Sequence, residues 1–269
     1  MRLSLLLLFI TLLTINTVKP LSSKAEIKKL KVFPDWLKNS LYSCQIPWVF
    51  NHQEKREQAN LDLLPSKLEA SITQNMAQYQ TPEWARLVDI KTINPNIILD
   101  IRYATKNNFL NQKLYPVAKC VLRKEVAEKL SQVQADLETI GLGLKVYDCY
   151  RPLSVTKKMW EVLPDSRYVA NPATGSRHNR GAAVDVTLTD LSTGKELEMP
   201  TEFDDFSAQA WRSYSGNKLE VQRNSELLNT KMKKYGFEPL ITEWWHFDAV
   251  GWENFSILDV PLDQIPKPN

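Results

Sequence analysis

The sequence has little net charge, few histidines and few cysteines. Its 269 residues hold 34 lysines and arginines against 31 aspartates and glutamates, a net charge of +3. Proteins that bind nucleic acids concentrate basic charge, so this balance predicts a mixed, soluble surface and no nucleic-acid partner. The three histidines are His52, His178 and His246. The chain also has no internal repeat and no low-complexity tract.

No hydrophobic run is long enough for a typical membrane span. The longest covers residues 3–15, whereas a spanning helix needs roughly 20 apolar residues. Met1-Arg2 before the run and Ser23-Lys24-Ala25 after it predict a secretory signal over residues 1–25, with a retained anchor as the weaker alternative. No cysteine follows the run, so a lipoprotein has no acceptor. We expect an exported protein, periplasmic or extracellular in a bacterium, with no stable membrane span after cleavage.

Cysteine is represented by Cys44, Cys120 and Cys149. Export permits a disulfide, and an odd count leaves at least one thiol over unless two chains pair. The sequence does not identify the pair. Cys149 lies beside a candidate functional motif, but a structural or bridged cysteine is favoured over a functional thiol.

The length and the 43% hydrophobic content suit one globular domain with an N-terminal extension. Residues 26–84 are polar with scattered aromatics and prolines, and predict an extension of unknown role with short helices such as residues 66–79. The compact domain is expected over residues 85–269. Apolar periodicity and turn residues predict an α+β domain with strands over residues 97–103, 144–150, 182–188 and 240–249, and helices over residues 123–140, 154–163 and 218–235.

The motif at residues 176–185 joins a loop histidine, His178, to an aspartate on the next strand, Asp185. Side chains alternate between the two faces of a strand, which places Asp185 on the polar face of a half-buried strand. Gly181 permits a turn that folds His178 back over this strand. Histidine nitrogen and carboxylate oxygen suit zinc. Taken alone, however, the motif is more simply explained by a loop histidine and a surface aspartate.

The second motif is Thr242-Glu243-Trp244-Trp245-His246. If His246 is a third zinc ligand, Glu243 is a candidate general base for a water molecule at the metal. A regular strand would place these two side chains on opposite faces, so a bulge or twist is required. The alternative is an aromatic strand whose histidine and glutamate face solvent.

The third motif, residues 147–152, places Arg151 at the end of a buried strand. Its guanidinium offers a fixed fork of donors to a carboxylate or to a developing oxyanion. A structural ion pair explains the same residue equally well.

Together the motifs resemble the zinc peptidases grouped with lysostaphin and the hedgehog N-terminal domain, and specifically the D-alanyl-D-alanine dipeptidases. They read Ser-x-His-x-x-Gly-x-Ala-x-Asp at residues 176–185, Glu-x-Trp-His at 243–246 and Tyr-Arg-Pro at 150–152. The family's alanine corresponds to Ala183, and the resemblance covers residues 87–259. It implies a hedgehog-like small antiparallel sheet with flanking helices.

The resemblance also implies the roles of individual residues. One zinc ion per chain is bound by His178, Asp185 and His246, with Glu243 as catalytic base and Arg151 stabilising the tetrahedral intermediate. Asp204 receives the free ammonium of a small D-dipeptide, and Tyr103 and Ser176 belong to the substrate pocket.

Two alternatives remain. A D,D-carboxypeptidase or L,D-endopeptidase would use the same ligands in a more open cleft, but a carboxylate such as Asp204 on a free amino terminus excludes long substrates and favours the dipeptidase. A non-catalytic zinc-binding module resembling hedgehog would need neither Glu243 nor Arg151.

Overall fold

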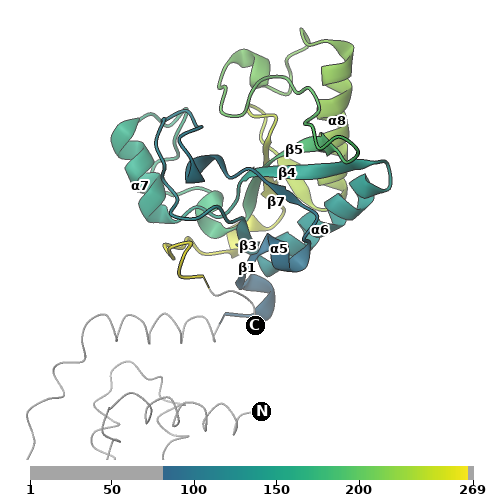
Figure 1. Cartoon of the computed structure of the whole chain (residues 1–269). Coiled ribbons are helices and arrows are strands. Elements are labelled where there is room, and N and C mark those ends of the chain that lie inside the picture. The colour runs from purple at the N-terminus through teal and green to yellow at the C-terminus, as the bar shows by residue number, and fades with distance from the viewer. Residues whose placement is uncertain (1–80, 266–269) are drawn as a thin grey trace, which may run out of the picture. The chain divides into compact units, whose positions relative to one another are not determined.

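The structure is a computed structural model that describes residues 81–265. Its centre is a five-stranded sheet in the order β2-β4-β5-β7-β6, in which β2 runs parallel to β4 and the other neighbours are antiparallel (Figure 1). A second sheet pairs β1 with β3. The strands are β1 Leu87–Asp89, β2 Ile98–Leu99, β3 Val121–Arg123, β4 Leu142–Asp148, β5 Ala183–Asp190, β6 Phe237–Pro239 and β7 His246–Ala249.

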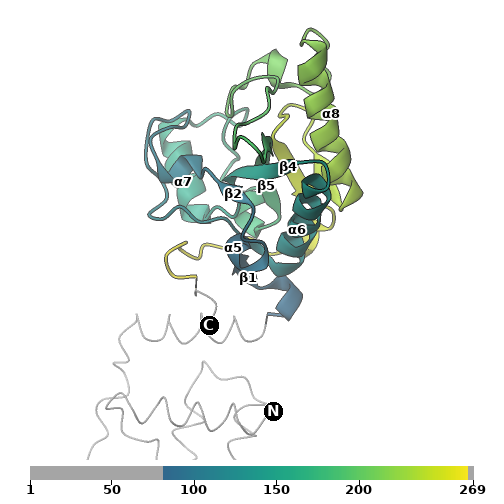
Figure 2. The same ribbon diagram turned by 45° about the vertical axis from the view of Figure 1, so that its right-hand side comes forward.

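Three helices match the apolar periodicity of the sequence. In α6 the apolar residues that recur every three or four positions are buried, namely Val126, Leu130, Val133 and Leu137. Helices α6 and α8 pack against the sheet and against each other, while α7 lies on the other side of the strands (Figure 2). The α-helices are α5 Ile90–Ile93, α6 Lys124–Glu138, α7 Leu153–Val162 and α8 Leu219–Lys234. The 3-10 helices are η1 Glu83–Ala85, η2 Arg102–Ala104, η3 His178–Arg180, η4 Ala208–Ala210 and η5 Trp252–Asn254.

Strand β5 is buried on both faces, so the prediction of a half-buried strand was wrong. Val184, Val186 and Leu188 are fully buried, as expected for the apolar face. The face that carries Asp185 and Thr187 is buried as well, and β5 is the central strand of the sheet. A buried carboxylate requires polar or charged partners, so the side chain of Asp185 must be paired with such groups inside the protein.

Two predicted strands are shorter than expected. Only Ile98–Leu99 of residues 97–103 is a strand, and Tyr103 lies in η2, where its carbonyl accepts hydrogen bonds from the backbone amides of Leu114 and Tyr115. Of residues 240–249, only His246–Ala249 is a strand. The preceding residues form a turn whose carbonyls bind the guanidinium of Arg212, with Nε donating to Leu240 and Nη2 donating to Trp244. Backbone amides of a later loop in the first case, and the side chain of Arg212 in the second, thus replace the expected sheet pairing.

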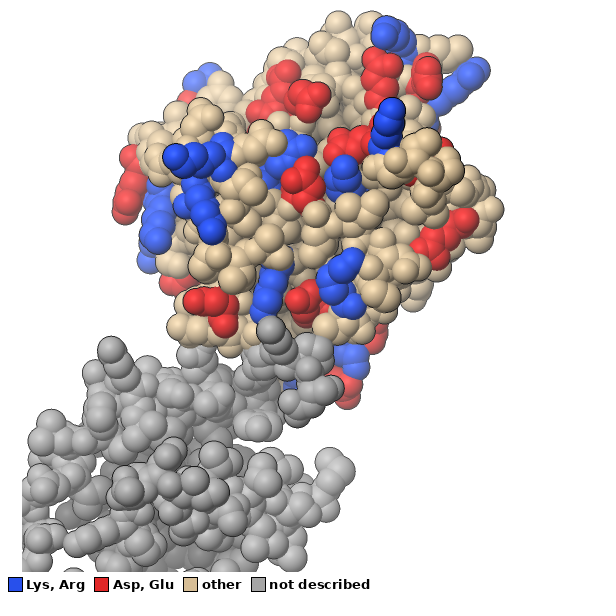
Figure 3. Space-filling view, in the orientation of Figure 1, with Lys and Arg blue, Asp and Glu red and all other residues tan. Residues whose placement is uncertain are grey.

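Charged side chains of both signs are interspersed on the face shown in Figure 3. Within residues 81–265, no helix has the length and apolar character needed to cross a membrane. The predicted signal segment, most of the extension with its helix at residues 66–79, His52 and Cys44 lie outside the described residues. The domain boundary between residues 84 and 85 stays a prediction.

Candidate active site

His178 is brought over the sheet by a tight turn. It opens η3, and Gly181 ends that helix with a φ of 68°, a conformation that favours glycine. A Cβ atom at Gly181 would lie 2.9 Å from the side chain of Leu87 and 3.3 Å from the backbone nitrogen of Arg123. Asp185 follows on β5, directly opposite His246 on β7. The loop therefore folds the histidine back over the strand as the sequence predicts.

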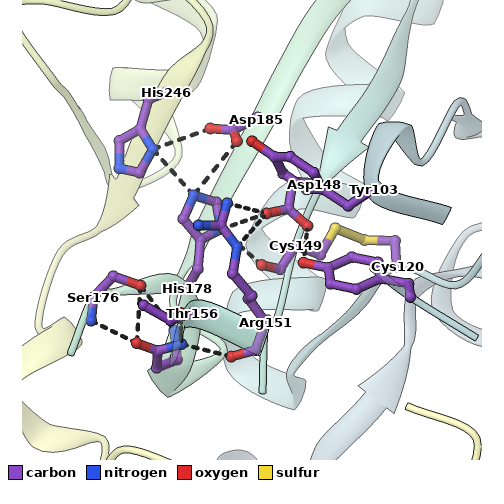
Figure 4. Close-up of polar contacts among 12 residues, drawn as sticks. Tyr103, Cys120, Asp148, Cys149, Arg151, Thr156, Ser176, His178, Asp185 and His246 are labelled. Atoms are coloured by element: carbon purple, nitrogen blue, oxygen red, sulfur yellow. Dashed lines mark hydrogen bonds and ion pairs between the residues drawn. A yellow bond between two sulfur atoms is a disulfide. The ribbon is translucent and has the colours of Figure 1, made fainter. Parts of the chain in front are cut away.

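The side chains of His178, Asp185 and His246 converge and are buried (Figure 4). Nε2 of His178 lies 3.2 Å from Nδ1 of His246 and 3.5 Å from Oδ2 of Asp185, while Nδ1 of His246 lies 3.0 Å from Oδ1 of Asp185. Ligand atoms about 2.0–2.1 Å from a tetrahedral zinc ion are about 3.3 Å apart. The observed spacings fit such a donor set.

Hydrogen bonds on the far side of each imidazole fix which nitrogen faces the centre. Nδ1 of His178 donates to the carbonyl of Cys149 at 2.7 Å, and Nε2 of His246 donates to the carboxylate of Asp248 at 2.9 Å. The remaining ring nitrogens therefore face each other and Asp185, where each can bind either a proton or a metal ion. Three acceptors that face one another require a cation, and this donor set fits a metal ion.

The pKa values of the site residues also reflect the close approach of these side chains. Burial disfavours the charged form of His246, but hydrogen bonds to Asp185 and Asp248 outweigh it and raise the pKa of His246 to about 10. Burial also disfavours charge on Asp185, yet the two histidines hold the pKa of Asp185 below its ordinary value. A positive charge at the centre is favoured in both cases.

Glu243 lies in the turn before β7, with Oε2 4.0 Å from Nδ1 of His246 and its side chain 21% exposed. Because it precedes the strand, it reaches the centre without the bulge that a continuous strand would require. Burial raises the pKa of Glu243, and the charge of Asp185 adds to this, while His246 opposes it. The turn is fixed by Arg212, whose Nη2 also donates to the carbonyl of His246 at 3.1 Å.

Arg151 is buried just beyond the end of β4. Its Nη2 and Nε donate to Oδ2 of Asp148 at 2.6 and 3.2 Å, and its guanidinium lies 4.8 Å from the ring centre of Tyr103. Burial alone would lower the pKa of Arg151, but Asp148 reverses the effect, and the pKa is raised well above its ordinary value. The hydroxyl of Tyr115 donates to Oδ1 of Asp148 at 2.7 Å. The guanidinium is therefore held rigidly and remains charged.

Asp204 is directed inward, unlike its exposed neighbours Glu202 and Asp205. The hydroxyl of Tyr103 lies 3.1 and 3.2 Å from the two carboxylate oxygens of Asp204. Burial, together with the negative charge of Asp185, raises the pKa of Asp204 well above its ordinary value. Its φ of 64° is uncommon for a residue other than glycine, and such conformations cluster at functional sites.

Ser176 is not brought together with the metal-facing residues. Its hydroxyl and backbone amide both contact Oδ1 of Asn179, at 3.2 and 2.7 Å. Asn179 in turn donates to the carbonyl of Arg151 and to the hydroxyl of Thr156, so this cluster ties the η3 loop to α7 (Figure 4). These contacts give Ser176 a structural role, and its predicted place in the substrate pocket stays a prediction.

Sequence reasoning missed several supporting residues. Asp248 could have been found, because residues two apart on a strand share a face and it follows His246 at that spacing. Asp148 lies inside the Arg151 motif but gave no separate signal. Tyr115 and Arg212 lie in no motif, and nothing in the sequence indicated their roles. Cys149 is bonded to Cys120, so the described cysteines are bridged and Cys149 is not a functional thiol.

Comparisons with known proteins agree with the motifs. A family model described as D-ala-D-ala dipeptidase matches residues 83–261. The D-alanyl-D-alanine dipeptidase of Escherichia coli (strain K12) is 35% identical over 172 residues, covering 64% of this chain and 89% of the relative. The enzyme of that name from Enterococcus faecium is 30% identical over 168 residues, covering 55% and 83%.

Two solved structures are also similar. VanYB in complex with D-Alanine-D-Alanine has a TM-score of 0.34 and 14% identity, covering 52% of this chain and 77% of that chain. The LdcB LD-carboxypeptidase has a TM-score of 0.38 and 19% identity, covering 68% and 79%.

Proposed function

The chain belongs to the D-alanyl-D-alanine dipeptidase family of metallopeptidases, and on that premise we propose that it hydrolyses D-alanyl-D-alanine with one zinc ion per chain. The observation that carries the proposal is the convergence of two histidine ring nitrogens and the carboxylate of Asp185, with Oε2 of Glu243 4.0 Å from Nδ1 of His246. His178, Asp185 and His246 would hold the metal. When bound, zinc lowers the pKa of a water molecule to about 7 and polarises the scissile carbonyl.

Glu243 is assigned the proton transfers. Its carboxylate accepts a proton from the attacking water and returns it to the nitrogen of the leaving D-alanine. The raised pKa supports this role, because a base works best when its pKa lies close to the working pH. Its position in a turn held by Arg212 keeps the carboxylate near His246 without making it a fourth ligand.

Arg151 is assigned the role of stabilising the negative charge that develops on the carbonyl oxygen. Asp148 and the ring of Tyr103 hold the guanidinium before substrate arrives, so little reorganisation is needed during the reaction. The ion pair with Asp148 is thus compatible with catalysis, and the structural and functional interpretations of Arg151 do not compete.

Asp204 is assigned the role of binding the free ammonium group of the substrate. An arriving ammonium would offset the burial and like-charge repulsion that raise the pKa of this carboxyl. A carboxylate in that place favours a free amino terminus and disfavours the acylated nitrogen of a longer stem peptide. This supports a dipeptidase over a carboxypeptidase or endopeptidase, and the positions of Glu243 and Arg151 argue against a non-catalytic zinc module.

The test is substrate selectivity. The full-length protein is incubated with D-alanyl-D-alanine, its N-acetylated form and a stem peptide ending in D-alanyl-D-alanine, with L-alanyl-L-alanine as the control for stereochemistry. Cleavage of the free D-dipeptide alone supports the proposal. Equal cleavage of the N-acetylated form would show that the enzyme does not recognise the ammonium group. The carboxypeptidase alternative would then replace the dipeptidase proposal.

We also propose export, with cleavage after a signal at residues 1–25. The Cys120–Cys149 disulfide supports an oxidising compartment. Because the dipeptide is made in the cytoplasm, an exported enzyme fits recycling or scavenging of wall fragments better than antibiotic resistance by depletion. Fractionation of cells followed by N-terminal sequencing tests this, and a cytoplasmic protein that retains Met1 would contradict it.

A further inference from the structure

One residue of the Glu-x-Trp-His motif, Trp245, has no role in the proposed hydrolysis. Its side chain is 1% exposed, and its carbonyl accepts a hydrogen bond of 3.0 Å from the backbone amide of Val186 on β5. Glu243 lies two residues before it, and His246 directly follows it. The indole is therefore held in the part of the chain that carries the proposed base and a proposed metal ligand.

The indole contacts two phenylalanines that flank Asp204 in the sequence. Its ring centre lies 5.5 Å from that of Phe203 and 6.0 Å from that of Phe206, and both pairs are edge-to-face. This arrangement is favourable, because the positive edge of one ring meets the negative face of the other. Among the described residues, Trp245 is the only aromatic side chain in contact with both phenylalanines.

Other rings hold the two phenylalanines from separate parts of the chain. Phe203 is buried, and its ring centre lies 4.7 Å from that of Tyr147 on β4. Phe206 is half-buried, and its ring centre lies 5.3 Å from that of Phe109 and 5.2 Å from that of Tyr168. The loop between the two phenylalanines is therefore held at both ends.

The position of the Asp204 carboxylate depends on this loop. Residues other than glycine keep a φ of 64° only where the surrounding structure imposes it. Among the described residues, Tyr103 is the only hydrogen-bond partner of the carboxylate, with its hydroxyl 3.1 and 3.2 Å from the two oxygens. A single hydroxyl leaves a carboxylate free to shift, so the packed phenylalanines are needed to keep it in place.

In the proposed function, on which this inference rests, Asp204 binds the ammonium group while Glu243 acts at the scissile bond. One residue of the substrate separates the two groups, so the two carboxylates must lie at a fixed distance from each other. A misplacement of about 1 Å can lower a rate roughly 100-fold. We propose that Trp245 is a positioning residue. Its contacts with the two phenylalanines fix Asp204 relative to Glu243, and the enzyme thereby selects a free D-dipeptide.

The test measures kcat and KM of the full-length, zinc-supplemented protein on D-alanyl-D-alanine and on its N-acetylated form. Trp245→Leu removes the shared ring. Phe206→Leu removes one of its contacts at a half-buried position, so this variant decides the question if Trp245→Leu does not fold. Each substitution is also made in an Asp204→Ala background. Phe237→Leu is the matched control, because Phe237 is likewise 1% exposed and has no aromatic contact among the described residues.

Trp245→Leu and Phe206→Leu are each expected to raise KM for the free dipeptide about tenfold or more, with kcat within about threefold of wild type, because the ammonium is remote from the reacting bond. Cleavage of the N-acetylated form should change little. In the Asp204→Ala background neither substitution should raise KM further, because the effect acts through Asp204. Phe237→Leu should leave both constants unchanged.

An unchanged KM in a folded variant would overturn the proposal. So would an equal loss on both substrates, a fall in kcat alone, a further loss in the Asp204→Ala background, or the same loss in Phe237→Leu, since each would place the effect elsewhere than at Asp204. A wild-type protein that cleaves both substrates equally well would instead contradict the dipeptidase assignment, and the role of Trp245 with it.

Discussion

Removing the Cys120–Cys149 disulfide is expected both to destabilise the protein and to weaken zinc binding at the proposed metal site. The two cysteines are 29 residues apart. Closing a loop of this size lowers the entropy of the unfolded chain by an amount worth about 3.6 kcal/mol at 25 °C in the chain-entropy model. Replacing both with alanine should therefore lower the free energy of unfolding by roughly 3–4 kcal/mol.

The link to the metal site runs through the backbone. Strand β4 ends at Asp148, and Cys149 is held beyond the sheet by its disulfide and by the hydrogen bond from the amide of Tyr150 to the carbonyl of Val121. The carbonyl of Cys149 accepts the hydrogen bond that orients His178. Loss of such an orienting partner costs about 10- to 100-fold in metal affinity. Since the carbonyl remains in the variant and only its position relaxes, we expect up to about tenfold weaker zinc binding.

The assay combines two measurements on the Cys120→Ala/Cys149→Ala variant. Urea denaturation gives the free energy of unfolding, and competition with a chelator gives the zinc affinity. Cys44→Ala is the control for removal of a cysteine. A destabilisation below about 1 kcal/mol would refute the loop-closure argument. Lower stability with unchanged zinc affinity and turnover would refute the coupling to His178.

Other substitutions separate the roles within the site. His246→Ala should abolish zinc binding, and unchanged metal content by mass spectrometry would show that the site is assigned wrongly. Glu243→Gln should retain zinc and lose about 100- to 10,000-fold in kcat; loss of metal as well would make Glu243 a ligand. Asp248→Asn should weaken zinc about 10- to 100-fold in a chelator titration, and unaltered affinity would exclude its orienting role. Asp204→Ala should lose kcat/KM roughly 30- to several-thousand-fold on the free dipeptide while the N-acetylated form is less affected, and an equal loss on both would contradict ammonium recognition.

Local patterns in the sequence predicted the features that depend only on neighbouring residues, such as helix α6 and the turn at Gly181. The spacing of Val126, Leu130, Val133 and Leu137 predicted α6, because the apolar face of a helix follows its own period. The Gly181 turn likewise placed His178 over β5, because a short loop has few ways to close. The family motifs added the residue roles that such patterns do not contain.

Features set by distant side chains could not be predicted. The guanidinium of Arg212 binds carbonyls of the turn before β7, 28 and 32 residues further along the chain, and so allows Glu243 to lie outside the strand. Tyr115 reaches Asp148 across 33 residues. The burial of the polar face of β5 depends on the rest of the fold, which the alternation of one strand does not reveal. Ser176 belongs to a motif, yet its contacts are decided by Asn179.

Zinc-dependent hydrolysis of D-alanyl-D-alanine is tested most directly by titrating zinc into metal-free protein while the release of D-alanine is followed. The account predicts no turnover without metal and a linear rise that ends at one zinc ion per chain. The His246→Ala variant should show no rise. Turnover by metal-free protein, or a rise that ends at two zinc ions per chain, would contradict a single catalytic zinc held by His178, Asp185 and His246.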